Sequence, residues 1–509
     1  MAQLILAHDL GTTGDKATLY SPDGQVVART FHGYETYHPR SNWAEQDPAD
    51  WWEAVRVCTQ RLFTHTRARP EDIACISFSG QMQACLPVDR RGQPLRRCII
   101  WADQRAVEQA AVLETKLGMA KVYRITGHRI TPTLSGAKIM WVRDHEPEVF
   151  AQVYKFLHVK DYIAYRLTGR FITDRSDASG MNLYDLEQGT WSTEILEAAG
   201  LDAALLPEIH DSTDVVGEVT REAAEELGLR AGIPVVIGGG DGASATVGAG
   251  AVREGLAYNY VGSSSWIALT TSQPLMDAGM KIFNYAHMIP GKFIPCGTMQ
   301  TAGGSYQWLR RQVCTLEALA AEQTGVDVYE IMNLKAEQSP PGANHLIFLP
   351  YLLGERTPYW NPKARGAFIG LTLKHTREDV IRATLEGITM NLKMILDTFL
   401  EAGAEIREVR VIGGGARGRF WRQLMANIYG LPILRPRFLE EATSLGAAIA
   451  GGIGVGLFRS FDVADRFIEL VDRHEPDPAT AAVYKRLFPI FQAAYTALCP
   501  IYEQLHALE

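Results

Sequence analysis

The order of apolar and polar positions near the start of the chain predicts three strands, a helix and a further strand. Apolar runs at residues 4–10 (LILAHDL), 17–21 (ATLYS) and 25–31 (QVVARTF) are separated by polar, glycine-containing turns, which is typical of neighbouring strands. Residues 47–63 open with Asp-Pro-Ala-Asp, a capping pattern, and then carry apolar side chains on one face, which predicts a helix. The run at 73–80 (IACISFSG) predicts a buried strand.

A similar order recurs in the second half of the chain. Residues 255–271 (GLAYNYVGSSSWIALTT) predict a strand, a polar turn and a second strand, and residues 292–299 add another before a helical pattern. Two β-branched runs, at 235–245 (VVIGGGDGASA) and 409–420 (VRVIGGGARGRF), each end in three glycines. No repeat is visible residue by residue, so the duplication is a hypothesis about architecture.

These patterns indicate two domains. We place the boundary near residues 245–255 and expect one domain at 1–247 and a second at 248–509. Within the second, residues 376–403 predict a long helix that starts with a capping-box-like pattern and ends at a glycine. The pattern leaves open whether this helix faces the core or a partner subunit in a homodimer.

Composition narrows the class of protein. The chain has 509 residues, 47% of them apolar and 21% charged, so it is long enough for large cores and unlike a disordered chain. The formal net charge is −8 without a basic run, which argues against nucleic acid or an anionic membrane as the main partner.

Seven cysteines without a CxxC motif exclude a disulfide framework and a thiolate zinc site. The first residues do not form a signal peptide, and the most apolar stretch, 445–458, is too short and glycine-rich to cross a bilayer, so we expect a cytoplasmic protein.

The turn after the first strand can bind phosphate. In Asp9-Leu-Gly-Thr-Thr-Gly, glycines allow close backbone approach, and the N–H groups of Gly11, Thr12 and Thr13 can meet phosphate oxygens. Asp9 ends an apolar strand, where a carboxylate is costly unless Lys16 or a nucleotide-bound Mg²⁺ compensates it. A hairpin turn without a ligand explains this segment equally well.

Two further glycine-rich segments extend this hypothesis. Gly262, Ser263 and Ser264 form a second turn of the same kind, and together the two turns can grip one polyphosphate. Asp241 follows three glycines at a strand end, where a carboxylate can act as a general base for a hydroxyl group. The alternative is that Asp241 is only a helix N-cap.

The glycines at 413, 415 and 418 formally match GxGxxG after a predicted strand. With Arg435 and Arg437 downstream, this pattern supports an NADP-dependent oxidoreductase as the rival interpretation. A non-catalytic scaffold or sensor that binds a nucleotide is a third interpretation. The chain contains no GxxxxGK[ST] motif, which disfavours a Walker-type NTPase.

A possible site for a polyhydroxylated ligand lies in the first half. Gln81, Met82 and Gln83 follow a buried strand, and Trp101 and Asp103 lie shortly after them, so an aromatic face stands near several hydrogen-bonding groups. By residue type alone, a structural tryptophan beside a surface Asp–Arg pair is the better interpretation.

Taken together, these segments resemble the FGGY family of carbohydrate kinases, over nearly the whole chain. The segments that carry the resemblance are DLGTTGDK (9–16), SGQMQA (79–84), IIWADQR (99–105), GGGDGASA (238–245), VGSSSW (261–266), YLLGERTPYWNPKARGAFIGL (351–371), HTREDVIRATLEGI (375–388), GGGARGRFWRQLMANIYGLPI (413–433) and TSLGAAIAGG (443–452). Within the family the chain is most like a xylulokinase. It departs from that pattern at Gln83, where xylulokinases have histidine, and at Thr133, where a signature more often has an aromatic residue, Met, Gly or Ser.

The resemblance implies an α/β fold of two actin-like, ribonuclease-H-like ATPase domains on either side of a deep cleft. It implies ATP-dependent phosphorylation of a ketopentose such as D-xylulose, with L-xylulose, ribulose, erythrulose, a polyol or a 1-deoxyketose as alternatives. ATP and Mg²⁺ would be the cofactors and a small sugar the partner. The implied residues are Asp241 as base; Gln81, Met82, Gln83, Trp101, Asp103 and Asp241 at the sugar; Gly11, Thr12, Thr13, Lys16, Gly262, Ser263, Ser264, Gly414, Gly415, Ala416 and Asn427 at ATP; and Asp9 at Mg²⁺ through water.

Overall fold

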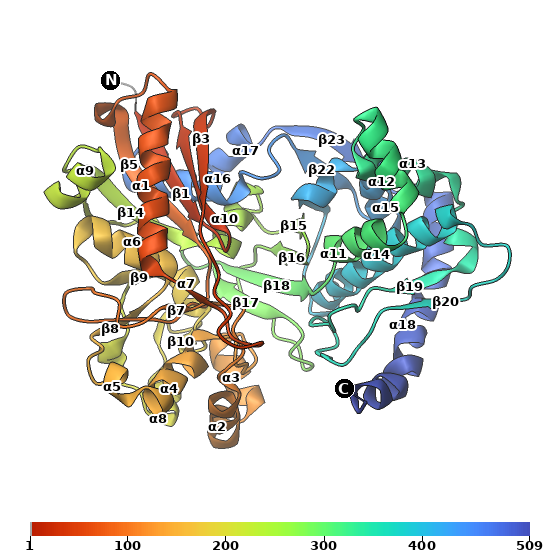
Figure 1. Ribbon diagram of the computed structural model, residues 1–509, viewed down its shortest axis with the longest axis horizontal. Coiled ribbons are helices and arrows are strands. Elements are labelled where there is room, and N and C mark those ends of the chain that lie inside the picture. The colour runs from red at the N-terminus through yellow and green to blue at the C-terminus, as the bar shows by residue number, and fades with distance from the viewer. Residues whose placement is uncertain (1–2, 509) are drawn as a thin grey trace.

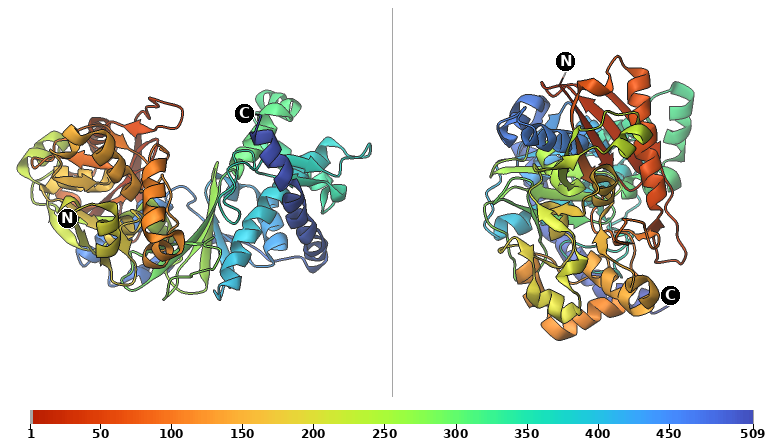
Figure 2. Two further views of the ribbon diagram at one scale, coloured as in Figure 1. Left: turned by 90° about the horizontal axis from the view of Figure 1, so that it is seen from below. Right: turned by 90° about the vertical axis from the view of Figure 1, so that its left-hand side faces the viewer.

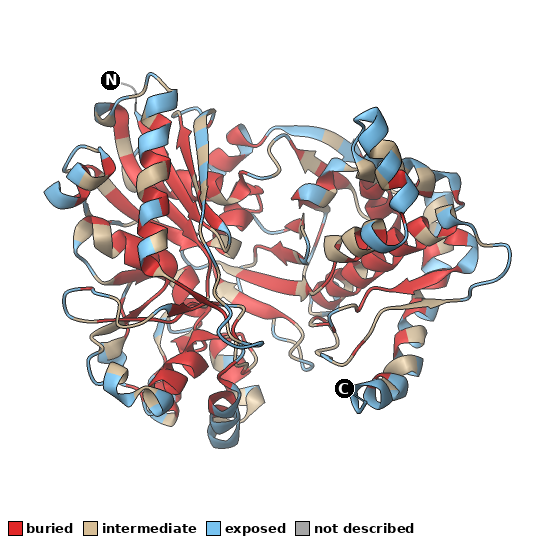
Figure 3. Cartoon of the chain, in the orientation of Figure 1, coloured by how far each residue is buried: buried red, intermediate tan, exposed pale blue. Residues whose placement is uncertain are grey.

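Two mixed β-sheets, one from each half of the chain, organise the protein (Figure 1). The computed structural model describes residues 3–508. Viewed from below, the molecule has two lobes that meet along one side (Figure 2). Buried residues follow the sheets and the helices packed on them, and exposed residues lie on the outer helices and loops (Figure 3).

The first sheet contains the predicted strands at the start of the chain. Its strands, in spatial order, are β13 (Val215–Glu218), β14 (Pro234–Gly240), β5 (Ile73–Gly80), β1 (Leu4–Leu10), β2 (Gly14–Tyr20) and β3 (Val26–Gly33). β1 pairs antiparallel with β2 and parallel with β5, and β5 pairs parallel with β14. The Asp47 side chain accepts the Ala49 N–H at the start of α1 (Pro48–His65), so the capping pattern acts as predicted.

The second sheet repeats this topology. Its order is β17 (Phe283–Ala286), β18 (Phe293–Met299), β16 (Ser265–Leu269), β15 (Leu256–Val261), β21 (Glu408–Ile412), β22 (Ile433–Pro436) and β23 (Leu470–His474). β15 pairs antiparallel with β16 and parallel with β21, and β21 pairs parallel with β22, as β1, β2, β5 and β14 do in the first sheet. The duplication inferred from the pattern of strands is therefore confirmed.

Helices cover both sheets. The main ones are α6 (Val159–Thr168), α9 (Arg221–Leu227), α10 (Asp241–Gly248), α11 (Gly303–Gln312), α14 (Arg377–Glu401), α15 (Arg419–Tyr429), α16 (Ala442–Gly454) and α18 (Pro478–His506). The capping box of α14 forms as predicted, since the Thr376 N–H donates to Asp379 (2.8 Å). Most of α14 is buried, so it belongs to the core of the second lobe.

Smaller elements complete the two lobes. In the first lobe they are β4 (Glu45–Gln46), β6 (Leu86–Val88), β7 (Cys98–Ile99), α2 (Val107–Leu117), α3 (Met119–Thr126), α4 (Ser135–His145), α5 (Pro147–Phe150), β8 (Lys155–Leu157), β9 (Ile172–Asp174), α7 (Arg175–Ser179), β10 (Tyr184–Asp185), β11 (Thr190–Trp191), α8 (Thr193–Ala199) and β12 (Glu208–His210). In the second half they are α12 (Thr315–Thr324), α13 (Val328–Gln338), β19 (Ile347–Leu349), β20 (Ala367–Ile369) and α17 (Ala464–Phe467).

One helix of the second half packs on the first sheet. α16 lies against β1, β5 and β14 and crosses α10 closely. A Cβ added at Gly446 of α16 would lie 2.0 Å from the carbonyl oxygen of Ser244, and one added at Gly248 of α10 would lie 1.7 Å from that of Ala442. Glycine at both positions lets the two helix backbones approach this closely. One core cluster therefore contains residues of both halves, and the predicted boundary at 247/248 falls at the end of α10.

Neither a membrane-spanning helix nor a disulfide is found among the described residues. Within residues 3–508, no helix combines the length and apolarity needed to cross a bilayer. The described cysteines are free thiols.

Candidate active site

The first glycine-rich turn joins β1 to β2 and leaves backbone donors free. The Gly11 N–H bonds to the carbonyls of Asp9 and Gly14 (both 3.1 Å), which closes the turn. Among the described residues, the N–H groups of Thr12 and Thr13 have no acceptor. Adjacent free N–H groups form the concavity that phosphate oxygens occupy in proteins. This geometry suits the phosphate-binding role predicted for the turn.

Gln81 lies beneath this turn. Its Nε2 donates to Oε1 of Gln46 (2.8 Å) and to the carbonyl of Gly11 (3.3 Å), and Gln46 in turn donates to the carbonyl of Thr12 (2.8 Å). Both glutamines are buried. Gln81 therefore supports the turn, while its Oε1 has no partner among the described residues. Sequence reasoning missed Gln46, because its neighbours along the chain give no sign of this contact.

Asp9 is a buried carboxylate shared between the two halves of the chain. Thr443, at the start of α16, donates a 2.5 Å hydrogen bond to its Oδ2, and the Lys16 ammonium lies 3.9 Å away. Burial raises the pKa of Asp9, while Lys16 opposes that shift. Lys16 also donates to the carbonyl of Glu440 (2.8 Å), so it fastens the turn to the second half. An oxygen ligand at the phosphate turn fits Mg²⁺, which proteins hold through one or two carboxylates plus water and phosphate.

Asp241 is the first residue of α10, directly after β14. The N-cap of this helix is Gly240, so the alternative interpretation of Asp241 as the N-cap is wrong. The carboxylate accepts the Gly242 N–H (2.7 Å) and forms no ion pair within the described residues. Burial, reinforced by the negative charges of Asp9 and Asp177, raises the pKa of Asp241 to about 7. A group with this pKa can accept a proton near neutral pH.

Of the predicted sugar contacts, Met82 lies beside the residue before Asp241, and Gln83 bonds Tyr285, which interacts electrostatically with Asp241. The Met82 side chain packs against Gly240, where an added Cβ would lie 2.6 Å from its sulfur. Gln83 adopts a positive φ of 63° and donates from Nε2 to the hydroxyl of Tyr285 (3.1 Å) on β17. Tyr285 comes from the second lobe and was not predicted, because nothing in its sequence surroundings marks it as functional.

The structure separates the roles of Trp101 and Asp103. Trp101 is 36% exposed and donates from Nε1 to the Thr12 hydroxyl (2.9 Å), so it borders the first turn. Asp103 is fully buried; it accepts from Arg105 (2.7 Å from Nη2) and from the Ala44 N–H (2.6 Å). The pair is therefore buried rather than superficial, and it occupies both Asp103 oxygens, which leaves neither free for a direct sugar contact.

The second turn mirrors the first and rests on the start of α11. Ser263 and Ser264 are exposed at its tip, while the carbonyl of Gly262 accepts the Gly303 N–H (2.9 Å). The Gly304 N–H donates to the carbonyl of Ser263 (2.8 Å). A Cβ at Gly303 would lie 2.3 Å from the Gly262 oxygen. Two glycines that sequence reasoning missed therefore allow this contact.

The third glycine-rich turn lies at the end of β21. Gly413 has a φ of 85°, and Cβ atoms added at Gly413 and Gly415 would lie 2.8 and 2.4 Å from atoms of Val261. Nothing lies within 4 Å of a Cβ added at Gly414, so that backbone faces open space, while Ala416 is buried behind it. Gly414 is thus the part of this turn that a ligand can approach.

Asn427 lies far from this turn. It is nine residues beyond the helix N-cap Gly418, which is about 13 Å along α15. Its Oδ1 accepts from Gln423 (3.1 Å) and from the Asp477 N–H (2.8 Å), so it ties α15 to the start of α18. These hydrogen bonds give Asn427 a packing role between the two helices, and its contact with adenosine stays a prediction.

Two sheets of one topology, each with a glycine-rich turn between its first two strands, define the actin-like class of fold. Comparison with known proteins makes the assignment specific. Residues 4–248 match the N-terminal domain of the FGGY family of carbohydrate kinases, and residues 257–455 match its C-terminal domain. The chain belongs to the FGGY family of carbohydrate kinases. It is therefore a sugar kinase with two actin-like domains, and the interpretation as an NADP-dependent oxidoreductase is wrong.

Its relatives include kinases for two kinds of sugar. The chain is 33% identical to a gluconokinase of Bacillus licheniformis over 99% of this chain and 98% of that one. It is 34% identical to a xylulose kinase of Staphylococcus epidermidis over 97% and 96%. A solved xylulose kinase from Lactobacillus acidophilus superposes with a TM-score of 0.92 at 29% identity, covering 99% of this chain and 100% of the other. The resemblance to xylulokinases is confirmed, and similar identity to a gluconokinase leaves the substrate undecided.

Proposed function

We propose that this kinase transfers the γ-phosphoryl group of ATP to a hydroxyl of a ketopentose, converting D-xylulose to D-xylulose 5-phosphate. The observation that carries the proposal is Asp241, a carboxylate with a pKa of about 7 and no ion-pair partner among the described residues. It lies close to Met82 and interacts electrostatically with Tyr285, the partner of Gln83. The xylulose kinase relatives support the choice of sugar.

In this mechanism Asp241 accepts the proton of the sugar hydroxyl while the oxygen of that hydroxyl attacks the γ-phosphorus of ATP. The free N–H groups of the first and second turns hold the phosphates, and Gly414 gives the adenosine room at the third. Asp9 would hold Mg²⁺ through water, and the cation would neutralise charge on the transferred group. Phosphoryl transfer needs mainly positioning and charge stabilisation, so rigid turns from both lobes suit it.

One observation favours gluconate as a second candidate substrate. Arg356 is half-buried, and its guanidinium has no hydrogen-bond or ion-pair partner among the described residues. Its electrostatic neighbours are Tyr285, which bonds Gln83, and Glu355. A half-buried cation without an ion-pair partner is only partly compensated, so the carboxylate of a sugar acid would be stabilised there. The gluconokinase relatives agree with this possibility.

The test is ADP release from MgATP with a panel of acceptors. The panel contains D-xylulose, D-ribulose, L-xylulose, erythrulose, glycerol, xylitol, D-gluconate and a sugar-free control. We expect D-xylulose to give the highest kcat/KM. Higher kcat/KM with D-gluconate would move the assignment to the second candidate, and no sugar-dependent release would contradict both.

The matched variant is Asp241→Asn. Asparagine can still accept the Gly242 N–H, but it cannot take the sugar proton. We expect turnover to fall at least about 100-fold, the scale of general-base catalysis, while ATP affinity stays nearly unchanged. Retention of most of the turnover would contradict the assignment of the base.

A further inference from the structure

A buried ionic cluster lies directly behind Asp241. Lys160 on α6 is fully buried, and its ammonium lies 2.7 Å from Asp161, 2.9 Å from Asp174 and 3.3 Å from Asp177. His158 completes the cluster through a 2.6 Å contact between its Nδ1 and Asp177. The Cβ of Lys160 lies 3.0 Å from a Cβ built on Gly80, which places the lysine at the carboxyl end of β5.

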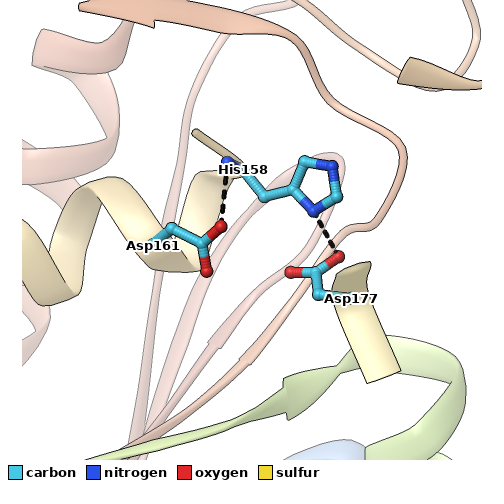
Figure 4. A group of neighbouring side chains, drawn as sticks. All are labelled: His158, Asp161 and Asp177. Atoms are coloured by element: carbon cyan, nitrogen blue, oxygen red, sulfur yellow. Dashed lines mark hydrogen bonds and ion pairs between the residues drawn. The ribbon is translucent and has the colours of Figure 1, made fainter. Parts of the chain in front are cut away.

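His158, Asp161 and Asp177 are close enough together to suggest a metal site (Figure 4). The Lys160 ammonium, however, touches both of these aspartates. A side-chain cation thus already neutralises the carboxylates that a metal ion would need, and burial closes the cluster to solvent. The cluster therefore has a structural role inside the protein and does not bind a metal ion.

A chain of hydrogen bonds leads from this cluster to the backbone beside Asp241. The second oxygen of Asp174 accepts the Ser176 hydroxyl (2.5 Å). Ser176 Oγ in turn accepts the N–H of Gly240 (3.0 Å), the residue immediately before Asp241. Because the Ser176 proton is directed to Asp174, a lone pair of its oxygen is available to Gly240.

We propose that the relay Lys160–Asp174–Ser176 positions the base, by fixing the Gly240 amide at the N-terminus of α10. This inference rests on the proposed role of Asp241. The need for such an anchor follows from the local sequence, since residues 238–240 and 242 are glycines and glycine backbone loses the most freedom on ordering. A carboxylate displaced by about 1 Å from its hydroxyl can lose about 100-fold in rate. Ser176 is thus a positioning residue, not a catalytic one.

The structure offers a matched pair of variants. Ser212 is buried like Ser176 and donates to the same Asp174 oxygen (2.8 Å), but among the described residues the Gly240 N–H bonds the Ser176 hydroxyl and not that of Ser212. Ser176→Ala and Ser212→Ala therefore remove the same group from the same acceptor. Removing Lys160 itself would leave three buried carboxylates without a cation and endanger folding, so the serines are the better test.

Two readouts separate positioning from stability. For S176A we expect kcat to fall about tenfold or more, with KM for ATP and sugar within about twofold of wild type, whereas S212A keeps kcat within about twofold. Hydrogen exchange of the unliganded protein reports the anchor directly. The amide of Gly240 should exchange at least about tenfold faster in S176A and unchanged in S212A.

The outcomes are distinguishable. Equal losses of kcat in both variants, or unchanged exchange at Gly240 in S176A, would overturn the positioning role. If D241N keeps its turnover, the proposed function fails; altered exchange in S176A would then still establish the anchor and remove its link to catalysis.

Discussion

At the scale of single residues, one carboxylate combines the features that the proposed reaction needs. Asp241 lies at the first position of a helix, is partly buried, and lies within the electrostatic influence of Asp9 and Asp177. Burial and the two neighbouring negative charges disfavour its charged form, whereas the Gly242 N–H stabilises it. The balance leaves a base whose proton affinity matches neutral pH.

The first prediction concerns the pH dependence of turnover. Because the pKa of Asp241 is raised to about 7 and only the ionised form can accept a proton, kcat should rise with pH and reach half its plateau near pH 7. The measurement is kcat at saturating ATP and sugar between pH 5 and 9, with the coupling enzymes in excess. A kcat that stays at its plateau down to pH 5 would contradict this assignment.

The second prediction concerns stability at the same residue. The unfolded chain ionises Asp241 near its ordinary pKa of 3.8, but the folded chain only near 7, so the cost of folding with a charged Asp241 grows as pH rises between these values. Asp241→Asn should therefore raise Tm by roughly 2–4 °C at pH 8, and by less at pH 5. Asp23→Asn, at an exposed position, is the control and should leave Tm unchanged at both pH values. An equal gain at pH 5 and pH 8 would exclude relief of charge as the cause.

At the scale of elements, glycines decide how closely turns and helices approach. The second glycine-rich turn rests on the N-terminus of α11 only because residues 303 and 304 lack side chains. Where α10 crosses α16, Gly248 and Gly446 lie against the backbone of the opposite helix. The high glycine content thus serves contacts between elements as well as contacts with ligands.

The third prediction tests the second turn with a graded pair. A methyl group at Gly303 would meet the Gly262 oxygen at 2.3 Å, whereas one at Gly304 would meet the Ser263 oxygen at 3.1 Å. Gly303→Ala should therefore displace the turn and raise KM for ATP about tenfold or more, with the milder Gly304→Ala within about threefold. Sugar binding by calorimetry should be unchanged in both. Equal ATP affinity in the two variants would show that the contact does not shape the turn.

The fourth prediction concerns the helix crossing. Gly446→Ala places a methyl group 2.0 Å from the Ser244 carbonyl, an atom that cannot move without shifting α10. Such overpacking should destabilise the protein by about 1–3 kcal/mol, measured as a lower midpoint in urea unfolding. Since α10 begins with Asp241, kcat should fall as well. An unchanged midpoint and kcat would mean that the two helices can separate without cost.

At the scale of the whole molecule, a few polar contacts connect residues that are distant in the chain around the site. Thr443 bonds Asp9, Lys16 bonds the Glu440 carbonyl, and Gln83 bonds Tyr285 across the lobes. These contacts place the first glycine-rich turn and Gln83, a predicted sugar residue, against segments of the second half. The site therefore depends on how the halves are held together.

The fifth prediction tests this dependence. Thr443→Val keeps the side-chain shape but removes the hydroxyl that stabilises the Asp9 carboxylate. A hydrogen bond to a charged group is worth about 1.5–3 kcal/mol, so KM for MgATP should rise about tenfold or more. Thr398→Val is the control, since that hydroxyl bonds only a carbonyl within its own helix. If both variants leave KM for MgATP unchanged, Asp9 needs no support from α16.

How far the sequence alone led depends on the kind of interaction. The order of strands along the chain, the capped helices and the glycine-rich turns are local signals, and they were confirmed. The actin-like fold, the family and the kinase activity came from the resemblance of these segments to FGGY kinases. Side-chain pairing is not local. Asp103 has the residue type of a sugar ligand, yet its oxygens are taken by Arg105 and Ala44. Asn427 stands in a family-like segment, yet it bonds the start of α18.

The sequence by itself thus determined the repeated topology and the chemistry of the turns, because backbone conformation depends on nearby residues. Only the tertiary structure decided which polar groups remain available to ligands. Gln81 and Gln46 are 35 positions apart, and Asp9 and Thr443 are 434 apart, so no local pattern records these contacts. The cluster around Lys160 is the strongest example. Its charges come from separate elements, and burial forces them to pair, which places a fixed anchor behind Asp241.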